Sequence, residues 1–458
     1  MPGGSESLAD SPVEAQGWKR CADGVGRAEV LAQTQAAIAV LHDFSDAIYD
    51  PQQVVSLTAP RDVLPGETPY VLGSASWGEG VWGRGYFTAK IDAPRFAGAD
   101  DHSAYAKWYR SRNNSTHPLI RDIARRAIAY MRLERRGEAP PGSLEKIAAA
   151  TDLLLRVQQP DGHYLVYRGL ASPGVPSALN WEETAGTIRS TYSTSQATRA
   201  LLLAYQFHEE RGTLTPQLEK RLRQALIRAA QWITQFREKV INRAYLNVRA
   251  QAIEALLAAY AVGGNVSFLD QAVDLFNGMK DRQREDGVWA LKGAPDELHD
   301  SDASYTGIIL RALLSLREHL PDDSSDPDHA LTVSDLERAI AKTTQHFLAA
   351  NTGWAKDAPA ARVTKDGHVR QYRARRRSTA GYGWQVATQI QRAVVLRVPG
   401  VDPEASSDLA HCMLGAMAGG VNNGTLFRET ATLMESLASF SASESAAPNA
   451  PDRRNGAF

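Results

Sequence analysis

The chain has 458 residues, of which 43% are hydrophobic and 22% charged, so it can bury a large core. Its formal net charge of −1 gives no electrostatic reason to expect a nucleic-acid partner. Its two cysteines, Cys21 and Cys412, are too few for a disulfide framework or a cysteine metal site.

Both ends of the chain are polar and poor in apolar anchors. Residues 1–25 and 441–458 are therefore predicted to be disordered, which leaves a single folded domain over residues 26–440. The first segment has no basic region followed by an apolar run, so it does not resemble a signal peptide. No stretch approaches the roughly 18 apolar residues that a membrane span requires. We therefore expect a cytoplasmic protein without a membrane span.

The domain opens with a one-sided helix predicted over residues 27–46 and a more buried helix over 115–131. Between them, residues 70–91 differ in composition from the rest of the domain, because glycines separate Trp77, Trp82, Tyr86 and Phe87. This Gly- and aromatic-rich insertion is predicted to be irregular or hairpin-like. It either forms an aromatic lid over a site or packs on the outside of the domain.

Two kinds of helix then alternate along the chain. The segments 215–236 and 334–350 are amphipathic, and Ser334 with Glu337 spells a capping box for the second. Between such segments are helices that open with small or polar residues around a tyrosine and then become apolar on all sides. They start near residues 191, 244, 303 and 380. All-round apolarity indicates burial on both sides.

A final pair, 404–418 and 425–440, completes about six outer–inner helical hairpins. This pattern predicts an all-α fold, an (α/α)6 toroid in which a ring of buried helices lies inside a ring of amphipathic ones. An open α-solenoid has the same alternation and is the alternative. Variable repeat lengths and long polar loops before the buried helices favour the toroid.

In a toroid, the loops that lead into the inner helices meet at one mouth of the ring. Five of the six predicted loops hold Asn, Asp, Glu or Arg near an aromatic or hydroxyl residue. Such groups can bind the hydroxyls and stack on the rings of a sugar. The predicted binding residues from these loops are Asn114, Trp181, Glu182, Tyr192, His299, Tyr305, Arg375, Arg376, Arg377 and Trp384.

The strongest chemical candidate is the acidic loop within 282–305, where Asp300 and Asp302 flank a helix start beside His299. Carboxylates that share a partly dry cleft acquire different pKa values and so supply an acid and a base. Glu183, in a second acidic loop, could supply the opposing carboxylate for glycosidic cleavage. The alternatives are a helix N-cap at Asp302, acids favoured in a first helical turn at Glu183, and solvated loops.

The segment "RQYRARRRS" (370–378) is the densest positive charge in the chain. At the mouth, its guanidinium groups would bind carboxylates or phosphates of a ligand in bidentate fashion. A solvated basic loop is the alternative.

The turn "QREDGVW" (283–289), followed by "SDASYTGIILRALL", resembles the repeat pattern of unsaturated glucuronyl and rhamnogalacturonyl hydrolases. It is also similar to toroid-type pectate and alginate lyases, as are "NNSTH" (113–117) and "RARRRSTAGY" (373–382), although in an order that differs from the alginate-lyase pattern. The lyase resemblance implies that Asn114 neutralises the substrate carboxylate, His117 removes the C5 proton and Tyr382 protonates the leaving oxygen.

The same turn looks like the Gln–Trp motif of class II terpene cyclases, which precedes an Asp-x-Asp-Asp motif. Here that motif reads Asp300-Ser301-Asp302-Ala303, with Ala in place of the last Asp. Asp302 stands at the position of the acid that would protonate an isoprenoid. A mouth rich in Arg, Asn and Glu differs from the aromatic lining that a carbocation requires.

The sequence thus favours an enzyme that cleaves a glycosidic bond of an acidic, uronate-containing oligosaccharide by hydrolysis or β-elimination. In hydrolysis Asp302 would be the general acid and Glu183 or Asp300 the base, with Arg375, Arg376 and Arg377 on the substrate carboxylate. A terpene cyclase is the second hypothesis and a non-catalytic binding scaffold the third. No cofactor or metal is expected, and the predicted partner is a small-molecule or oligosaccharide substrate.

Overall fold

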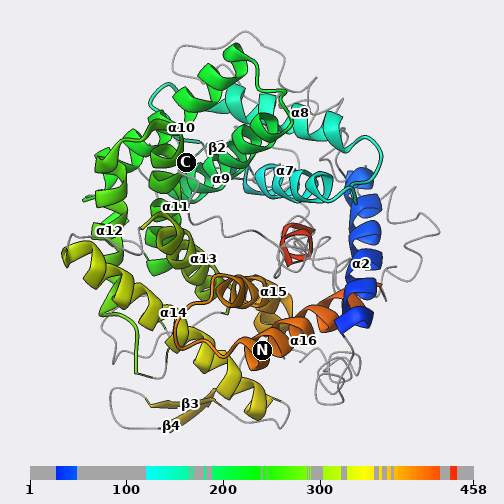
Figure 1. Cartoon of the computed structure of the whole chain (residues 1–458), viewed down its shortest axis with the longest axis vertical. Coiled ribbons are helices and arrows are strands. Elements are labelled where there is room, and N and C mark those ends of the chain that lie inside the picture. Colours follow the sequence, from blue (N-terminus) through cyan, green and yellow to red (C-terminus); the bar gives the residue numbers. More distant parts are fainter. Residues whose placement is uncertain are drawn as a thin grey trace, which may run out of the picture.

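The computed structural model describes a set of segments that together form the ring of Figure 1: residues 27–48, 120–164, 167–168, 180–181, 188–238, 241–243, 245–285, 287, 289, 303–320, 327–354, 360–363, 369–372, 376–422 and 434–440. Two concentric layers of helices are visible there. The prediction of an all-α (α/α)6 toroid is confirmed.

The outer layer contains six helices in the described residues. They are α2 (Arg27–Ile48), α8 (Ser143–Val157), α10 (Pro216–Phe236), α12 (Val266–Lys280), α14 (Pro327–Trp354) and α16 (Pro403–Asn422). The first and last, α2 and α16, pack against each other and close the outer layer (Figure 1). At this seam Val30 of α2 lies against Gly415 of α16. An open solenoid would leave these two helices apart, so the alternative fold is wrong.

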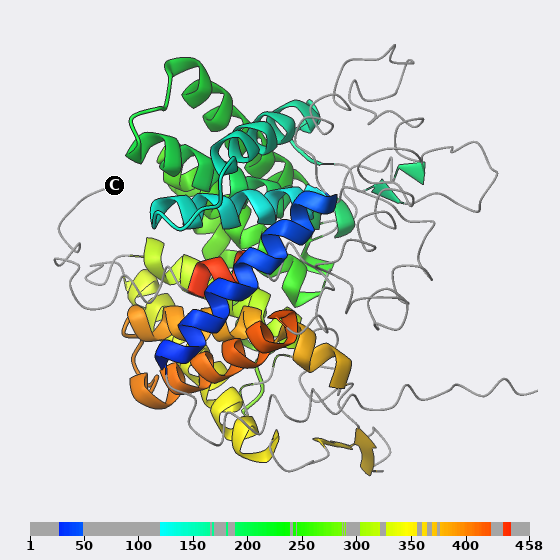
Figure 2. The ribbon, with the colours of Figure 1, turned by 90° about the vertical axis from the view of Figure 1, so that its right-hand side faces the viewer.

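The inner layer consists of α7 (Ile120–Arg135), α9 (Ile188–Glu210), α11 (Leu246–Gly263), α13 (Ala303–His319), α15 (Arg376–Val395) and the helical segment 434–440. Each inner helix packs against the next in chain order. Thr388 of α15 donates a hydrogen bond to the Ser436 carbonyl, and Arg136, just after α7, donates one to the Ala438 carbonyl. Segment 434–440 thereby joins the two ends of the inner layer, and Figure 2 shows it at the level of α2.

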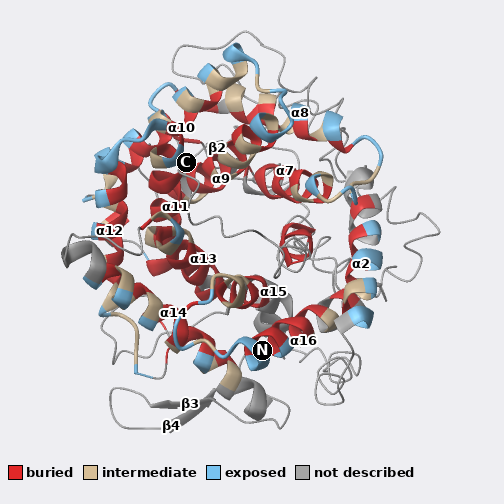
Figure 3. Cartoon of the chain, in the orientation of Figure 1, coloured by how far each residue is buried: buried red, intermediate tan, exposed pale blue. Residues whose placement is uncertain are grey.

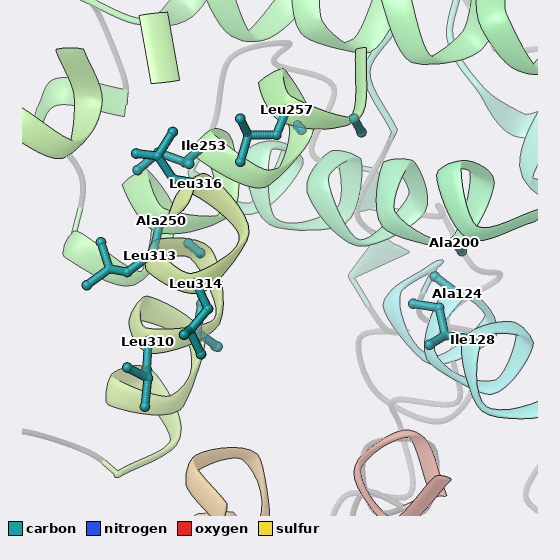
Figure 4. Packing of buried hydrophobic residues seen from close by; sticks show 14 of the residues in the cluster. Ala124, Ile128, Ala200, Ala250, Ile253, Leu257, Leu310, Leu313, Leu314 and Leu316 are labelled. Atoms are coloured by element: carbon teal, nitrogen blue, oxygen red, sulfur yellow. The ribbon is translucent and has the colours of Figure 1, made fainter. Parts of the chain in front are cut away.

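Burial follows the two kinds of helix that the sequence predicted. Helix α11 is buried on nearly all sides, whereas α10 buries a single stripe that begins at Leu222 and ends at Ile233 (Figure 3). Thr215 caps α10, because its side chain accepts a hydrogen bond from the Leu218 amide. Figure 4 shows buried apolar side chains on the neighbouring inner helices, among them Leu310, Leu313 and Leu314 on α13 and Ala250, Ile253 and Leu257 on α11.

The short elements between helices are the strands β1 (Tyr167–Arg168), β2 (Asn180–Trp181), β3 (Ala360–Val363) and β4 (Val369–Tyr372), and the 3-10 turn η2 (Ile241–Arg243). The strands form two antiparallel pairs, β1 with β2 and β3 with β4. Among the described helices, none combines the length and apolarity needed to cross a bilayer.

Several predicted boundaries are wrong. Helix α14 begins at Pro327 rather than Ser334, so the capping box does not exist: Ser334 lies within the helix, and Glu337 instead accepts a hydrogen bond of 2.8 Å from Arg317. The predicted basic loop is also interrupted, because 369–372 is a strand and α15 begins at Arg376. Proline at a first helical position needs no amide donor, which explains the earlier start of α14.

The predicted disordered ends, residues 1–25 and 441–458, and the aromatic insertion 70–91 lie outside the described residues. Cys412, on α16, is disulfide-bonded, although two cysteines are too few for a disulfide framework. Disulfides persist mainly in oxidising compartments. The cytoplasmic location therefore stays a prediction.

Candidate functional site: the axis of the ring

Helices α7, α9, α11 and α13 run in the same direction, which brings their N-terminal ends to one end of the ring. Between α9 and α11, Gln196 contacts Gln251 and three residues later Arg199 contacts Glu254. Between α11 and α13, Glu254 pairs with Arg311, and further along Tyr260 lies 6.0 Å from His319, between ring centroids. Such contacts advance together only between parallel helices. The predicted common mouth at the start of the inner helices is consistent with this arrangement.

A buried charge network lies midway along the inner helices. Arg311 of α13 binds both carboxylate oxygens of Glu254 of α11, at 2.6 and 2.8 Å. Arg199 of α9 lies 3.3 Å from Glu254 and donates a hydrogen bond of 2.6 Å to Glu435 of segment 434–440. Arg125 of α7 lies 3.6 Å from the other oxygen of Glu435. Four inner helices and segment 434–440 are thus linked across the axis of the ring.

The electrostatics of this network exclude Glu435 as a proton donor. Burial alone would raise the pKa of Glu435, but Arg199, Arg311, Arg125 and Arg132 lower it to about 2. Burial likewise acts to lower the pKa of Arg311, and its bidentate pair with Glu254 raises that pKa overall. Glu435 and Arg311 are therefore charged near neutral pH.

One helical turn closer to the N-terminal ends lies a layer of amides. Gln196 of α9 donates a hydrogen bond of 3.0 Å to the Gln251 carbonyl oxygen of α11, and Gln196 Oε1 in turn accepts one from Arg199. The Gln251 Nε2 and the Asn247 Oδ1 are buried without a hydrogen-bond partner. A buried polar group left unpaired costs about 1–3 kcal/mol, a cost that a hydrogen bond to a bound ligand or water would remove.

A buried hydroxyl lies beside this amide layer on α9: the Ser195 Oγ, one turn before Arg199, has no partner within the described residues. Thr194, on the other side of α9, accepts a hydrogen bond from the Tyr164 amide at 3.0 Å. Tyr192, one turn nearer the start of α9, is half-buried against the core and close enough to Arg311 to influence the pKa of that guanidinium group. Amide, hydroxyl and phenol groups therefore line the axis towards the N-terminal ends of the inner helices. The guanidinium and carboxylate groups of the charge network lie one helical turn further along. This combination suits a ligand rich in hydroxyl and carboxylate groups.

The turn "QREDGVW" has a structural role that explains its residues. Gln283, three residues after the end of α12, donates hydrogen bonds to the carbonyls of Gly287 and Ala339 and to the Thr343 hydroxyl. Trp289 donates to the same hydroxyl at 3.0 Å. The turn therefore ties α12 to the next outer helix, α14.

The turn "QQPDGHY" repeats this arrangement between α8 and α10. Gln158 donates hydrogen bonds to the carbonyls of Gly162 and Ala225, at 2.9 and 2.7 Å. Gly162 adopts a positive φ of 104°, and a Cβ there would collide with the Arg228 carbonyl. His163 stacks on Trp232 and contacts the Asp161 carboxylate at 2.5 Å. We call the turns 158–164 and 283–289 the two outer clasps.

Most predicted site residues lie outside what the structure describes. They are Asn114, His117, Glu182, Glu183, His299, Asp300, Asp302 and Arg375. The backbone of Trp181 is in β2, Tyr305 is in the first turn of α13, and Arg376, Arg377, Tyr382 and Trp384 are in the first half of α15, but their side chains are not described. Tyr192 alone is placed with its side chain, near the axis. The proposed roles of all these residues stay predictions.

Sequence reasoning missed the axial charges. Their signal is one charged residue, followed by alanine and two apolar residues, within otherwise apolar helices: "RALL" at 199–202 and again at 311–314, "EALL" at 254–257 and "RAVV" at 392–395. A lone charge in an apolar helix must find a partner on another element, because an unpaired buried charge is too costly. Within the described residues, no group of three or more His, Cys, Asp or Glu could hold a metal ion.

Comparison with known proteins gives little further information. No family model matches the chain, and no curated protein matches it. Among solved structures, the GH family 9 endoglucanase J30 is similar with a TM-score of 0.37 and 16% identity, over 66% of this chain and 54% of that chain. Its Zn-binding triple mutant gives the same values. The chain thus spans about half the length of the endoglucanase, and at this TM-score the similarity does not extend to function.

Proposed function

We propose that the protein is a carbohydrate-active enzyme that cleaves a glycosidic bond in an acidic, uronate-containing oligosaccharide. The observation that carries this proposal is the amide layer in the ring, where Gln251 and Asn247 each hold a buried atom without a partner. Hydroxyls of a sugar both donate and accept hydrogen bonds, so they could satisfy both atoms. The guanidinium groups beneath would favour a ligand with carboxylates.

The chemistry would come from the loops ahead of the inner helices. Glu435 is held ionised and Glu254 is paired with two arginines, so neither suits a general acid. The candidates remain Asp302 as acid with Glu183 or Asp300 as base for hydrolysis, or Asn114, His117 and Tyr382 for β-elimination. Both routes place the scissile bond above the amide layer.

The charged axis speaks against the isoprenoid alternative. A carbocation intermediate requires an apolar or aromatic lining, whereas the described part of the axis holds Arg199, Arg311, Glu254 and Glu435. The cyclase is therefore the less favoured hypothesis. The experiment below also distinguishes it, and the non-catalytic scaffold, from a glycosidic enzyme.

The test measures cleavage of oligouronides and of neutral oligosaccharides by the wild type and by matched glutamine variants. Gln251→Leu should lower kcat/KM on the oligouronide by about 10–100-fold, since it removes hydrogen bonds to the substrate. Gln345→Leu, at an exposed position of α14, is the control and should retain activity. The double bond formed by elimination absorbs in the ultraviolet, so its appearance separates the lyase from the hydrolase.

Asp302→Asn completes the experiment. It should abolish cleavage while leaving the Tm nearly unchanged, because a loop carboxylate that acts in catalysis contributes little to the core. Cleavage at the wild-type rate would remove Asp302 from the mechanism. Hydrocarbon products from a prenyl diphosphate, or no turnover of any substrate, would reject the glycosidic proposal in favour of the cyclase or the scaffold.

A further inference from the structure

Helix α7 points a second arginine towards the axis. Arg132 lies seven residues after Arg125, which places both on one face of the helix. The charges that act on Arg132 are those of Glu435, Arg199, Arg392 and Arg311, from four other elements of the inner layer. Arg132 is in the last turn of α7, so it lies towards the C-terminal ends of the parallel inner helices. This is the end opposite to the predicted mouth.

The charges around Arg132 do not balance. Arg125, Arg132, Arg199 and Arg311 are four positive charges, and Glu254 and Glu435 are two negative ones, which leaves an excess of two positive charges in this set. The ion pairs within the described residues reach Arg125, Arg199 and Arg311 but not Arg132. Arg392, the fifth arginine, is paired with Glu318.

The surroundings of Arg132 disfavour its charged form. Burial and the charges of Arg199, Arg392 and Arg311 lower the pKa of Arg132 to about 9, against the opposing influence of Glu435. Arg132 nevertheless keeps an intermediate exposure, so small solutes can reach it. A half-exposed guanidinium group that has no ion pair within the described residues is a suitable donor for an oxyanion.

We propose that Arg132 binds a small oxyanion such as phosphate, sulfate or a sugar carboxylate at the C-terminal end of the ring. The bound anion balances the excess charge and stabilises the closed ring. This site is separate from the amide layer and does not depend on the proposed glycosidic activity.

A competing explanation for the excess charge comes from the helices themselves. Parallel inner helices direct their C-terminal carbonyls, which carry partial negative charge, towards this end of the ring. If these carbonyls already balance Arg132, no anion is needed there, and loss of Arg132 destabilises the protein. The two explanations therefore predict opposite effects of removing the charge.

Thermal unfolding at constant ionic strength, with chloride replaced stepwise by phosphate, sulfate or glucuronate, tests the proposal. The Tm of the wild type should rise by about 2–4 °C at saturation, relative to chloride. Arg132→Gln should abolish this rise and have a higher Tm than the wild type in chloride alone. The control Arg135→Gln changes another arginine of α7 and breaks its ion pair with Glu210 of α9, and it should keep the response.

Arg132→Lys keeps the charge but loses the guanidinium fork, so it should weaken the response without abolishing it. The order of the three anions identifies the source: a larger response to glucuronate indicates a sugar carboxylate, and a larger response to phosphate or sulfate a tetrahedral anion. The proposal is overturned by a wild type that does not respond, by an equal response in Arg132→Gln, or by a lower Tm of that variant in chloride.

Discussion

Glu435 shows how one buried residue couples distant parts of the chain. Its carboxylate is shared by Arg199 and Arg125, from two other inner helices, and only 7% of its side chain is exposed. The two arginines offset the free-energy cost of burying the Glu435 carboxylate. If the carboxylate is removed, each arginine loses this partner while remaining buried. Breaking a buried pair in this way typically costs about 3–5 kcal/mol.

We therefore expect Glu435→Gln to lower the free energy of unfolding by about 3 kcal/mol at neutral pH. Glu210→Gln is the control, because Glu210 is 55% exposed and its pair with Arg135 should contribute at most about 1 kcal/mol. Denaturant unfolding of both variants measures the two losses. Equal losses would show that the axial network adds no stability of its own.

The pH dependence of stability follows from the same carboxylate. The pKa of Glu435 falls from 4.5 to about 2 on folding, so the folded state takes up this proton less readily than the unfolded state. The stabilisation is complete above pH 4.5 and is lost as the pH falls towards about 2. Between these limits the wild type should lose stability more steeply than Glu435→Gln. Parallel curves for the two proteins would show that Glu435 titrates normally.

At the scale of elements, the outer clasps determine how successive outer helices are joined. Gly287 adopts a positive φ of 85°, and a Cβ there would collide with the Lys342 carbonyl of α14. Gly212, between α9 and α10, also has a positive φ, of 65°, but no atom lies within 4 Å of its Cβ position. Substitution of Gly212 therefore measures the cost of the positive φ alone. Substitution of Gly287 measures that cost together with the collision with α14.

Gly287→Ala should lower the free energy of unfolding by about 2–4 kcal/mol, whereas Gly212→Ala should cost about 1 kcal/mol. Both variants pay for a positive φ, and the first must also displace the α14 backbone. Equilibrium denaturation gives both values. Similar values for the two variants would mean that the clasp tolerates separation of α12 from α14.

The elements were the part of the fold that the sequence predicted best. One-sided and all-round apolar patterns separate outer from inner helices because each layer buries a different share of its surface, as α10 and α11 demonstrate. The predicted start of α14 at Ser334 was wrong, because a serine and a glutamate at capping-box spacing also occur within helices. The axial network was missed for another reason: Glu254 and Arg311 are 57 residues apart, and pairing across a ring leaves no local periodicity.

At the scale of the whole molecule, the central question is how the ring is closed. The seam lies between α2 and α16, which are separated by more than 350 residues of sequence and pack directly together (Figure 1). His42 of α2 and Tyr130 of α7 form a hydrogen bond of 3.0 Å, so α2 is also held by the inner layer. Closure lets α2 and α16 stabilise each other.

Gly415 of α16 is the point at which this closure can be tested. A Cβ at Gly415 would lie 3.1 Å from Val30 Cγ2, so Gly415→Leu must push α2 away from α16. Leucine is a good helix former, and the helix itself should therefore survive the change. The expected loss is about 2–4 kcal/mol of unfolding free energy, with faster amide hydrogen exchange in residues 27–48 as well as in 403–422.

Gly278→Leu, at an exposed position of α12, provides the matched control, because its Cβ would be in ordinary contact 3.9 Å from Arg249 Nη1. It should leave exchange at the seam unchanged. Exchange that increases in α16 but not in α2 would mean that the two helices are not joined in solution. In that case the ends of the inner layer would separate too, the axial charges would not meet, and the proposals for the amide layer and for the anion at Arg132 would lose the geometry they share.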